Sequence, residues 1–548
     1  MAAPVALSLE VLSRTRLHPS SRDDANPRTV PLSILDNTCA KYTLASAAWY
    51  FDPPTDPACM TPEALTQSLR KTIDSYPQWA GQLHWVPYDL AKGQRQGRVA
   101  VTYGSPDDPG VELVLTRYPE TLASLVPGHE DRMQASSLGP LAWDANSFPS
   151  DALNCPTQLA LHETNEYAGR PAVSVQLTTF ACGGLGIRVK LVHCLADATA
   201  MMHFVKDWAA VHRALIHGQP LPTLSPVFHP ALVNQATAGD VHSATADPDI
   251  LRISRSLPMC RYDWWASAEG CPEPMLPSTR IPQELAGTDL GPPGDIIPWS
   301  DWDLYAPVSH YLVYFTPAEV QRIWEASNST DDTSSTTPPA RISRLDALLA
   351  FIWRLIVRAR GLEHDRELVH IMVTIGLRSR LSPPLPNTFL GSPITLARVS
   401  LPAAEIASHS KSGLPATPAA AIRASMAQFT PCALSALLHD TAHDVNPQHI
   451  WRACLGRRHS IVTSWQGLDV YGVDFGGGAP PRYVDAVMPN MDGCIHVMEA
   501  GPPTSGAGDG TGGRWYAEPV CLSLHLATDV MERLLKDSEL RRYRDTTN

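Results

Sequence analysis

A long tract with little regular pattern divides the chain into two halves. From about residue 218 to 340 the sequence is rich in Pro, Ser, Thr and Asp, and it includes STDDTSSTTPPA at 329–340. Because sustained hydrophobic periodicity is missing over that length, the tract predicts a long crossover between two lobes. We therefore expect an N-terminal lobe over 1–217, a Pro-rich crossover and insertion over 218–340, and a C-terminal lobe over 341–548.

Strands and helices are both predicted in the N-terminal half. Residues 61–76 have helical spacing of apolar residues, begin at a capping Thr61 and should end before Pro77. The segment PAVSVQLTTFACGGLGIRVKLVH, residues 171–193, alternates apolar and polar residues on both sides of CGG, which predicts a hairpin. From Ala198 onward the apolar residues recur every three or four positions, which predicts a helix.

The C-terminal half shows the same mixture. Residues 342–361 have the broad apolar face of a helix, with Ser343 and Asp346 approximating a capping box and Gly361 closing it. Strand-like segments follow at 370–377, 459–465 and 520–526. Strands mixed with helices in both halves predict an α/β architecture of mixed sheets flanked by helices.

Composition and charge exclude several classes of function. The 548 residues are 44% hydrophobic and 18% charged, with a net charge of -12, as in an ordinary soluble globular protein. We expect no nucleic-acid partner, because duplex phosphates require a broad basic surface. The longest apolar run, ALLAFIW, is too short to cross a bilayer, so we expect no membrane partner either.

The cysteines and the N-terminus predict the compartment. Eleven cysteines are scattered, odd in number and never spaced as C-x-x-C, which argues against a disulfide framework and a zinc site. The opening MAAPVALSLEVLSR has no basic leader before its short apolar stretch. We therefore expect a cytoplasmic protein with no metal.

The pattern H-x-x-x-D occurs three times, at His193 with Asp197, at His203 with Asp207 and at His525 with Asp529. The second pair lies one turn apart inside a predicted helix, where an ordinary surface or half-buried pair explains it. The third follows a strand, and its aspartate suits a helix cap. His193 lies at a junction from strand to helix, a position that exposes a side chain while anchoring it from both sides. On this pattern alone, a junction histidine bonded to the backbone is favoured over a catalyst, and the context that favours a catalyst comes from farther along the chain.

Those segments carry a resemblance to a known family. Residues 461–481, IVTSWQGLDVYGVDFGGGAPP, place Thr-Ser-Trp at a strand end, and Asp-Phe-Gly-Gly-Gly begins nine residues after the Trp. With PLSILD at 31–36 and GLRSRLSPPLPNTFLGSP at 376–393, they resemble the BAHD superfamily of acyl-CoA-dependent acyltransferases, which includes trichothecene acetyltransferases and plant hydroxycinnamoyl transferases. The chain departs from the family pattern at Ala198, where the family often has Gly, and at Gly477, where it has Trp.

The resemblance implies a fold and a reaction. The fold would be the two-lobed chloramphenicol acetyltransferase-like fold, with an active-site channel between the lobes. The protein, which we expect to be a monomer, would bind acyl-CoA as cosubstrate and a small-molecule acceptor, and would transfer an acetyl or other short acyl group to a hydroxyl or amine. His193 would be the general base of a direct, ternary-complex mechanism.

The same resemblance assigns the supporting residues. Asp197 would tie down the loop through an arginine, Arg378 in our interpretation. Trp465, helped by Thr463, would face the oxyanion. Asp474 and Gly476 would form a structural turn that braces the C-terminal lobe. The candidates for contacts with the coenzyme phosphates are Arg380, Arg457 and Arg458.

Four alternatives remain at this point. A covalent role for Cys194 is disfavoured, because adjacent strand residues point to opposite faces. A peptide-synthesis condensation domain would favour a second histidine where this chain has Val192. A repurposed member could bind a metabolite and catalyse a CoA-independent rearrangement or condensation. A hydrolase could use His193 to activate water.

Overall fold

Two mixed β-sheets form the framework of the computed structural model, which describes residues 8–20, 26–41, 43–134, 142–328, 341–408, 416–503 and 515–544. The low-complexity segment 329–340 lies outside these ranges. No helix within the described ranges has the length and apolar character needed to cross a membrane.

The N-terminal sheet has six strands in the order β1-β6-β8-β9-β3-β16. Strands β6 and β8 run parallel and the other neighbours antiparallel. The predicted hairpin is present, with the residues of β8 pairing in register with those of β9 across the CGG turn. In sheet order the strands are β1 (Glu10–Leu17), β6 (Val111–Tyr118), β8 (Val173–Phe180), β9 (Leu185–Val192), β3 (Leu44–Phe51) and β16 (Tyr483–Ala486).

The C-terminal sheet has seven strands in the order β13-β12-β15-β17-β18-β11-β7, with parallel pairs at its centre. In sheet order they are β13 (Ile394–Pro402), β12 (Leu368–Gly376), β15 (His459–Ser464), β17 (Cys494–Glu499), β18 (Val520–Ala527), β11 (Val308–Phe315) and β7 (Ala142–Asp144). There are also two smaller sheets. One has three strands in the order β2 (Arg28–Pro31), β5 (Val99–Tyr103) and β4 (Gln82–Trp85), and the other pairs β10 (Tyr262–Asp263) with β14 (Ile450–Trp451).

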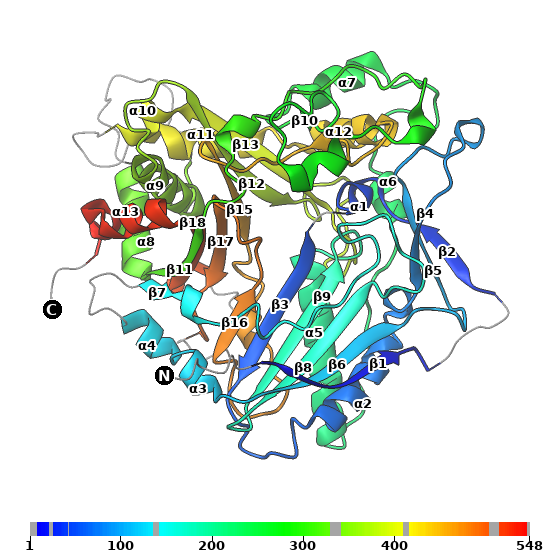
Figure 1. The fold of residues 1–548 in the computed structure, drawn as a ribbon, viewed down its shortest axis with the longest axis vertical. Helices are drawn as coiled ribbons and strands as arrows, with labels where there is room; N and C mark the ends of the chain where they lie inside the picture. Colours follow the sequence, from blue (N-terminus) through cyan, green and yellow to red (C-terminus); the bar gives the residue numbers. More distant parts are fainter. Residues whose placement is uncertain are drawn as a thin grey trace.

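The two halves exchange strands. β7 comes from the N-terminal half but pairs with β11 in the C-terminal sheet, and β16 comes from the C-terminal half but pairs with β3. Figure 1 shows the two sheets side by side with β16 reaching from one to the other. Each lobe is therefore completed by a strand from the other half of the chain, which the boundaries expected at 217 and 341 did not anticipate.

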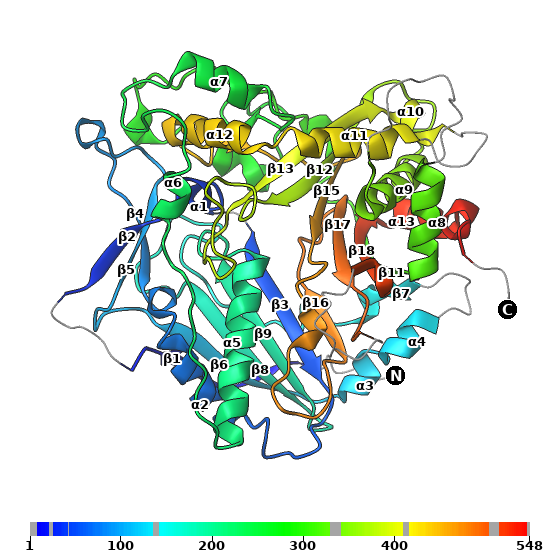
Figure 2. The same ribbon diagram turned by 180° about the vertical axis from the view of Figure 1, so that it is seen from behind.

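Helices flank both sheets. The long helix α5 (Ala198–Ile216) lies across the N-terminal sheet, as seen from behind in Figure 2. α8 (Pro317–Asn328), α9 (Arg344–Ala359) and α13 (Thr528–Lys536) group beside the C-terminal sheet in Figure 1. The others are α1 (Ile34–Thr38), α2 (Pro62–Ile73), α3 (Leu122–Leu125), α4 (His129–Gln134), α6 (Ala231–Asn234), α7 (Pro248–Arg255), α10 (Ala403–Ala407), α11 (Ala416–Ala427) and α12 (Pro431–His443).

The predicted capping signals act as expected. Thr61 accepts a hydrogen bond from the backbone N–H of Ala64 at the start of α2. At α9, the Ser343 and Asp346 side chains each bond to the other's backbone N–H, which is the complete capping box. Gly361 follows the helix with a φ of +66°, a conformation that glycine adopts without strain.

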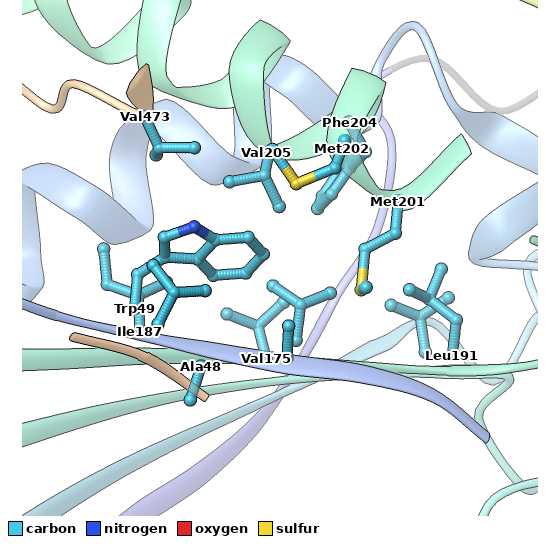
Figure 3. Packing of buried hydrophobic residues seen from close by; sticks show 14 of the residues in the cluster. Ala48, Trp49, Val175, Ile187, Leu191, Met201, Met202, Phe204, Val205 and Val473 are labelled. Carbon is cyan, nitrogen blue, oxygen red and sulfur yellow. The ribbon is translucent and has the colours of Figure 1, made fainter. Parts of the chain in front are cut away.

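The packing of α5 on the sheet fixes the start of that helix in space. Figure 3 shows Trp49, Val175 and Ile187 of the sheet facing Met201 and Val205 of α5. All are buried, and each such side chain contributes roughly 1.5–3 kcal/mol when it leaves water. Because the helix axis is held this firmly, the five residues that join β9 to α5 have little freedom.

Candidate functional site

The junction between β9 and α5 carries His193. The three residues that follow it, Cys194, Leu195 and Ala196, are buried, so the turn is anchored in the core on both sides. The helix then begins behind Asp197, whose carboxylate accepts a hydrogen bond from the backbone N–H of Ala200 at 3.0 Å. An aspartate is among the preferred residues at this position, because its oxygen satisfies one of the first free N–H groups of the helix.

Asp197 faces an arginine rather than the imidazole. Its two oxygens accept hydrogen bonds from both terminal nitrogens of Arg378, which lies 181 residues away and follows β12. Arg378 also donates to the backbone carbonyl of Phe389 at 2.9 Å. Both side chains are largely buried, so this bidentate pair fastens the loop 377–393 to the start of α5.

The His193 ring is half-buried, and one of its nitrogens is bonded. Nδ1 lies 2.7 Å from the hydroxyl oxygen of Ser392. Burial lowers the pKa of His193 below 6.5, while the negative charge of Asp197 acts in the opposite direction. Nε2 bonds to no described residue. It is also not among the fully buried polar atoms that lack a partner, so it can bond to a bound molecule. A neutral imidazole with a free Nε2 is able to accept a proton from a bound molecule.

Two polar residues at this site were not predicted from the sequence. Ser392 bonds to His193, and Asp36 of α1 accepts the backbone N–H of Ser392 at 2.6 Å. Burial raises the pKa of Asp36 to about 6. Both residues lie in segments that carry the family resemblance, PLSILD and FLGSP, but a Ser-x-x-Asp pattern predicts only a local cap.

Trp465 follows the end of β15 and is 6% exposed. Its backbone N–H donates to Val497 at 2.9 Å, and its ring meets the edge of His496 at a centroid distance of 5.2 Å. It belongs to the same buried cluster as Val192 and Cys194, the neighbours of His193. Thr463 is half-buried two residues earlier on the strand, in register with His496.

The turn at Asp474 and Gly476 braces the N-terminal lobe, contrary to our expectation of the C-terminal one. Asp474 accepts the N–H of Gly476 at 2.7 Å, and its backbone carbonyl accepts a hydrogen bond from Arg213 of α5. Phe475 packs edge-to-face on Trp208 of the same helix, with centroids 5.0 Å apart. The reason is topological, because the chain is already crossing over to form β16 in the N-terminal sheet.

Gly477, where the family pattern has Trp, is closely packed. A Cβ at this position would lie 2.5 Å from the sulfur of Met60. A side chain here would therefore require Met60 to move.

The three arginines proposed for the coenzyme lie in different surroundings. Arg458 pairs with Asp365 at 2.6 Å and with Asp301 at 3.7 Å, and Arg457 donates to the carbonyl of Arg360. Both precede β15, so they lie at the end of that strand away from Trp465. Arg380 donates to the carbonyl of Met426. A contact of these residues with coenzyme phosphates stays a prediction.

Cys194 is held as an unreactive thiol. It is 1% exposed, and burial raises its pKa well above 9.0. The thiolate is the nucleophilic form of cysteine, and it is disfavoured here. This agrees with the sequence argument against a covalent role for Cys194.

Comparisons with known proteins agree with this geometry. A model of the Transferase family matches residues 146–259 and 306–515. Acyltransferase AFT15-1 of Alternaria alternata is 26% identical over 87% of this chain and 88% of its own length. Acyltransferase abl6 of Leptosphaeria maculans is 25% identical over 97% of this chain and 98% of its own.

Solved structures of similar fold are also known. TRI101 of F. sporotrichioides, complexed with coenzyme A and T-2, superposes with a TM-score of 0.59 and 17% identity, over 94% of this chain and 99% of that one. Vinorine synthase superposes with a TM-score of 0.57 and 17% identity, over 98% of both chains. The two-lobed fold of mixed sheets flanked by helices, expected from the sequence, is thereby confirmed.

Proposed function

This chain belongs to the Transferase family, the BAHD acyltransferases, and on that premise we propose that it moves an acyl group from acyl-CoA to a small secondary metabolite. The acceptor atom is a hydroxyl oxygen or an amine nitrogen, and the donor is acetyl-CoA or another short acyl-CoA. The observation that carries the proposal is His193, with Nδ1 bonded to Ser392 and Nε2 bonded to no residue of the described ranges.

The geometry supports a direct transfer. Nε2 of His193 removes the proton from the acceptor as its oxygen or nitrogen attacks the thioester carbonyl. The tetrahedral intermediate then collapses, the carbon–sulfur bond breaks, and the same imidazole returns the proton to the departing thiolate of coenzyme A. One histidine therefore performs both proton transfers, and the reaction as written needs neither a metal ion nor an acyl-enzyme.

The negative charge on the intermediate requires a donor. Trp465 and Thr463 are our candidates, because the indole N–H and the hydroxyl come from the end of one strand, β15. Losing one such donor commonly costs about 10²–10³ in rate. Asp197 and Arg378 would hold the loop in place, and Arg380, Arg457 and Arg458 remain our candidates for coenzyme contacts.

Support for the substrates comes from the relatives. The matched fungal proteins are acyltransferases, and TRI101 was solved with coenzyme A and the mycotoxin T-2. Putrescine hydroxycinnamoyltransferase 1 of Oryza sativa, 24% identical over 84% of each chain, is named for transfer to an amine. We therefore keep both acceptor classes, with a monomeric cytoplasmic enzyme as our expectation.

Mass spectrometry tests the proposal. The purified protein is incubated with a mixture of acyl-CoAs and with panels of hydroxylated and amine-bearing metabolites. We expect one defined mass increment on one acceptor, together with release of free coenzyme A. Release of free acid at the same rate without an acceptor would indicate a hydrolase, and conversion of a metabolite without coenzyme A would indicate a repurposed enzyme.

His193→Ala identifies the base. We expect kcat to fall about 10²- to 10⁴-fold, because general base catalysis contributes that much. The matched control is His217→Ala, at an exposed histidine at the C-terminal end of α5, which should keep its activity. Equal activity in the two variants would refute the proposed role of His193.

A further inference from the structure

We infer that Ser392 and Asp36 are positioning residues for His193. They form a chain of hydrogen bonds, the relay, that runs from α1 through the loop 377–393 to the imidazole and holds the ring in place. The inference deepens the proposed function and rests on it, because it concerns the group that we take to be the base. The relay joins three segments that lie far apart in the sequence, and it uses contacts that local capping does not require.

The first contact of the relay is the hydrogen bond between His193 and Ser392. A histidine that accepts a proton at Nε2 carries its own proton on Nδ1, so the Ser392 oxygen, 2.7 Å away, acts as the acceptor. Ser392 is 0% exposed, so water has no access to replace the hydroxyl. The bond fixes the ring orientation and the tautomer, and it continues to stabilise the ring when Nε2 becomes protonated.

The second contact is the hydrogen bond that holds the Ser392 backbone. Oδ1 of Asp36 accepts the N–H of Ser392 at 2.6 Å, while Oδ2 accepts the N–H of Ser33 at 3.0 Å. The cap of α1 uses Oδ2 alone. The bond through Oδ1 spans 356 residues and adds nothing to the cap, so it points to a role outside the helix.

The peptide at Gly391 is held from the other side as well. Its carbonyl accepts the backbone N–H of Asp197 at 3.1 Å. Gly391 has a φ of +130°, and a Cβ on it would lie 3.1 Å from Oδ1 of Asp36. A glycine is needed here because both the conformation and the close approach exclude a side chain. Residues 391 and 392 are thus held by hydrogen bonds from α1 on one side and from the start of α5 on the other.

A second capping box in the same chain provides a control. Asp346 of α9 is buried like Asp36, and its Oδ2 accepts the N–H of Ser343 at 2.8 Å. Its other partner is Arg423, on α11, and no bond of this carboxylate leads to His193. The two aspartates share a local motif and differ only in what lies beyond the helix.

Ser392→Ala tests the first contact. We expect kcat to fall about 10- to 100-fold with little change in KM for either substrate, because the lost bond is to a group that becomes charged during the reaction. The acid limb of the kcat/KM profile should move to lower pH, since the protonated ring loses an acceptor. Ser392→Thr, which keeps the hydroxyl, should restore most of the activity and the original pH limb.

The acid limb of the kcat/KM profile must be shown to come from His193 and not from a neighbouring titratable group. The other titratable or charged groups that face this site are Asp36, Asp197, Arg378, Cys39 and Cys194. The two thiols have raised pKa values, and a guanidinium group does not lose its proton in the acid range. Asp36→Asn removes the carboxyl group whose pKa burial raises to about 6. The acid limb should therefore persist in Asp36→Asn and be lost in His193→Ala.

Asp36→Asn, compared with Asp346→Asn, tests the second contact. An amide offers one acceptor where Asp36 meets two N–H donors, so one donor loses its partner. At a temperature where both variants are folded by circular dichroism, we expect kcat to fall about tenfold in Asp36→Asn and to stay unchanged in Asp346→Asn.

Three outcomes would overturn the inference. The first is wild-type kcat in Ser392→Ala, the second is an equal loss in both aspartate variants, and the third is a loss in Ser392→Ala that appears in KM alone. Full activity in His193→Ala would instead refute the proposed function, so the two failures can be told apart.

Discussion

His193 and His525 occupy similar places in the chain, and the structure gives them different surroundings. Each lies at a transition from strand to helix, and each has an aspartate four residues later. Asp197 is buried and bonds to Arg378 from another part of the chain, whereas Asp529 is exposed and bonds to Arg533 one turn along the same helix. The same pattern therefore fixes a loop in one place and forms an exposed ion pair within one helix in the other.

The two histidines differ as much as the two aspartates. His525 is buried, stacks on His310 with ring centroids 4.0 Å apart, and has Nδ1 3.2 Å from the Asn490 side-chain oxygen. His193 is half-buried, and its Nδ1 bonds to Ser392 of the loop 377–393. The comparison teaches that H-x-x-x-D acquires chemical meaning only from the partner that each side chain meets across the fold.

The largest predicted difference is between Asp197→Ala and Asp529→Ala. Asp197→Ala leaves Arg378 largely buried without its carboxylate and removes a helix cap, so the free energy of unfolding should fall by about 3–5 kcal/mol. Asp529→Ala breaks an exposed pair and should change it by no more than about 0.5 kcal/mol. Urea unfolding measures both, and similar values for the two variants would contradict the distinction.

The next prediction concerns pH and the surroundings of His525. Burial lowers the pKa of His496 to about 3 and that of His525 well below 6.5. The His310 ring lowers both pKa values further, and the His496 ring also lowers that of His525. The unfolded chain therefore binds more protons than the folded one between about pH 6.5 and 3. The free energy of unfolding should have its full value above pH 6.5. It should fall by about 2 kcal/mol between pH 7 and pH 5 for each buried histidine whose pKa is lowered in this way.

His496→Phe checks that prediction, because it removes one titrating ring while keeping an aromatic side chain against Trp465. The difference in stability between pH 7 and pH 5 should shrink by about 2 kcal/mol. Asp36 acts in the opposite direction, since its pKa of about 6 lets the folded protein take up a proton that the unfolded chain binds only near pH 4. An unchanged pH dependence in His496→Phe would show that this ring does not gain a proton when the chain unfolds.

The smallest effect is predicted for the remaining H-x-x-x-D pair, His203 with Asp207. The hydroxyl of Tyr76 donates to Asp207 at 2.7 Å, and Asp207 is half-buried on α5. Tyr76→Phe should lower the free energy of unfolding by about 1 kcal/mol and leave kcat unchanged. A loss of kcat in the folded variant would mean that this pair, too, reaches the site.

Local patterns predicted many elements of the fold. The hairpin of β8 and β9, helix α5 and the capped helices α2 and α9 all lie where periodicity and capping residues placed them. Each depends on contacts within about 20 residues, which the sequence displays directly. The exchange of β7 and β16 between the sheets was not predicted, because strand partners are chosen by long-range packing.

The candidate site shows the same limit. His193, Asp197 and Arg378 were named from motifs, and the structure brings Asp197 and Arg378 together. The contact of Ser392 with Asp36 was missed, because a Ser-x-x-Asp motif has the same form in α1 and in α9. The turn at Asp474 and Gly476 was assigned to the wrong lobe, because the sequence does not show that the chain has changed sheets by that point.

The sequence by itself determined the hairpin of β8 and β9, the starts of α2, α5 and α9, and which residues are chemically able to act as a base. Only the tertiary structure decided which of three histidines bonds to Ser392, and which of two capping aspartates holds the backbone of that serine. The physical reason is that periodicity and caps act over a few residues, whereas a hydrogen bond such as that between Asp36 and Ser392 forms only after packing has brought distant segments within 3 Å.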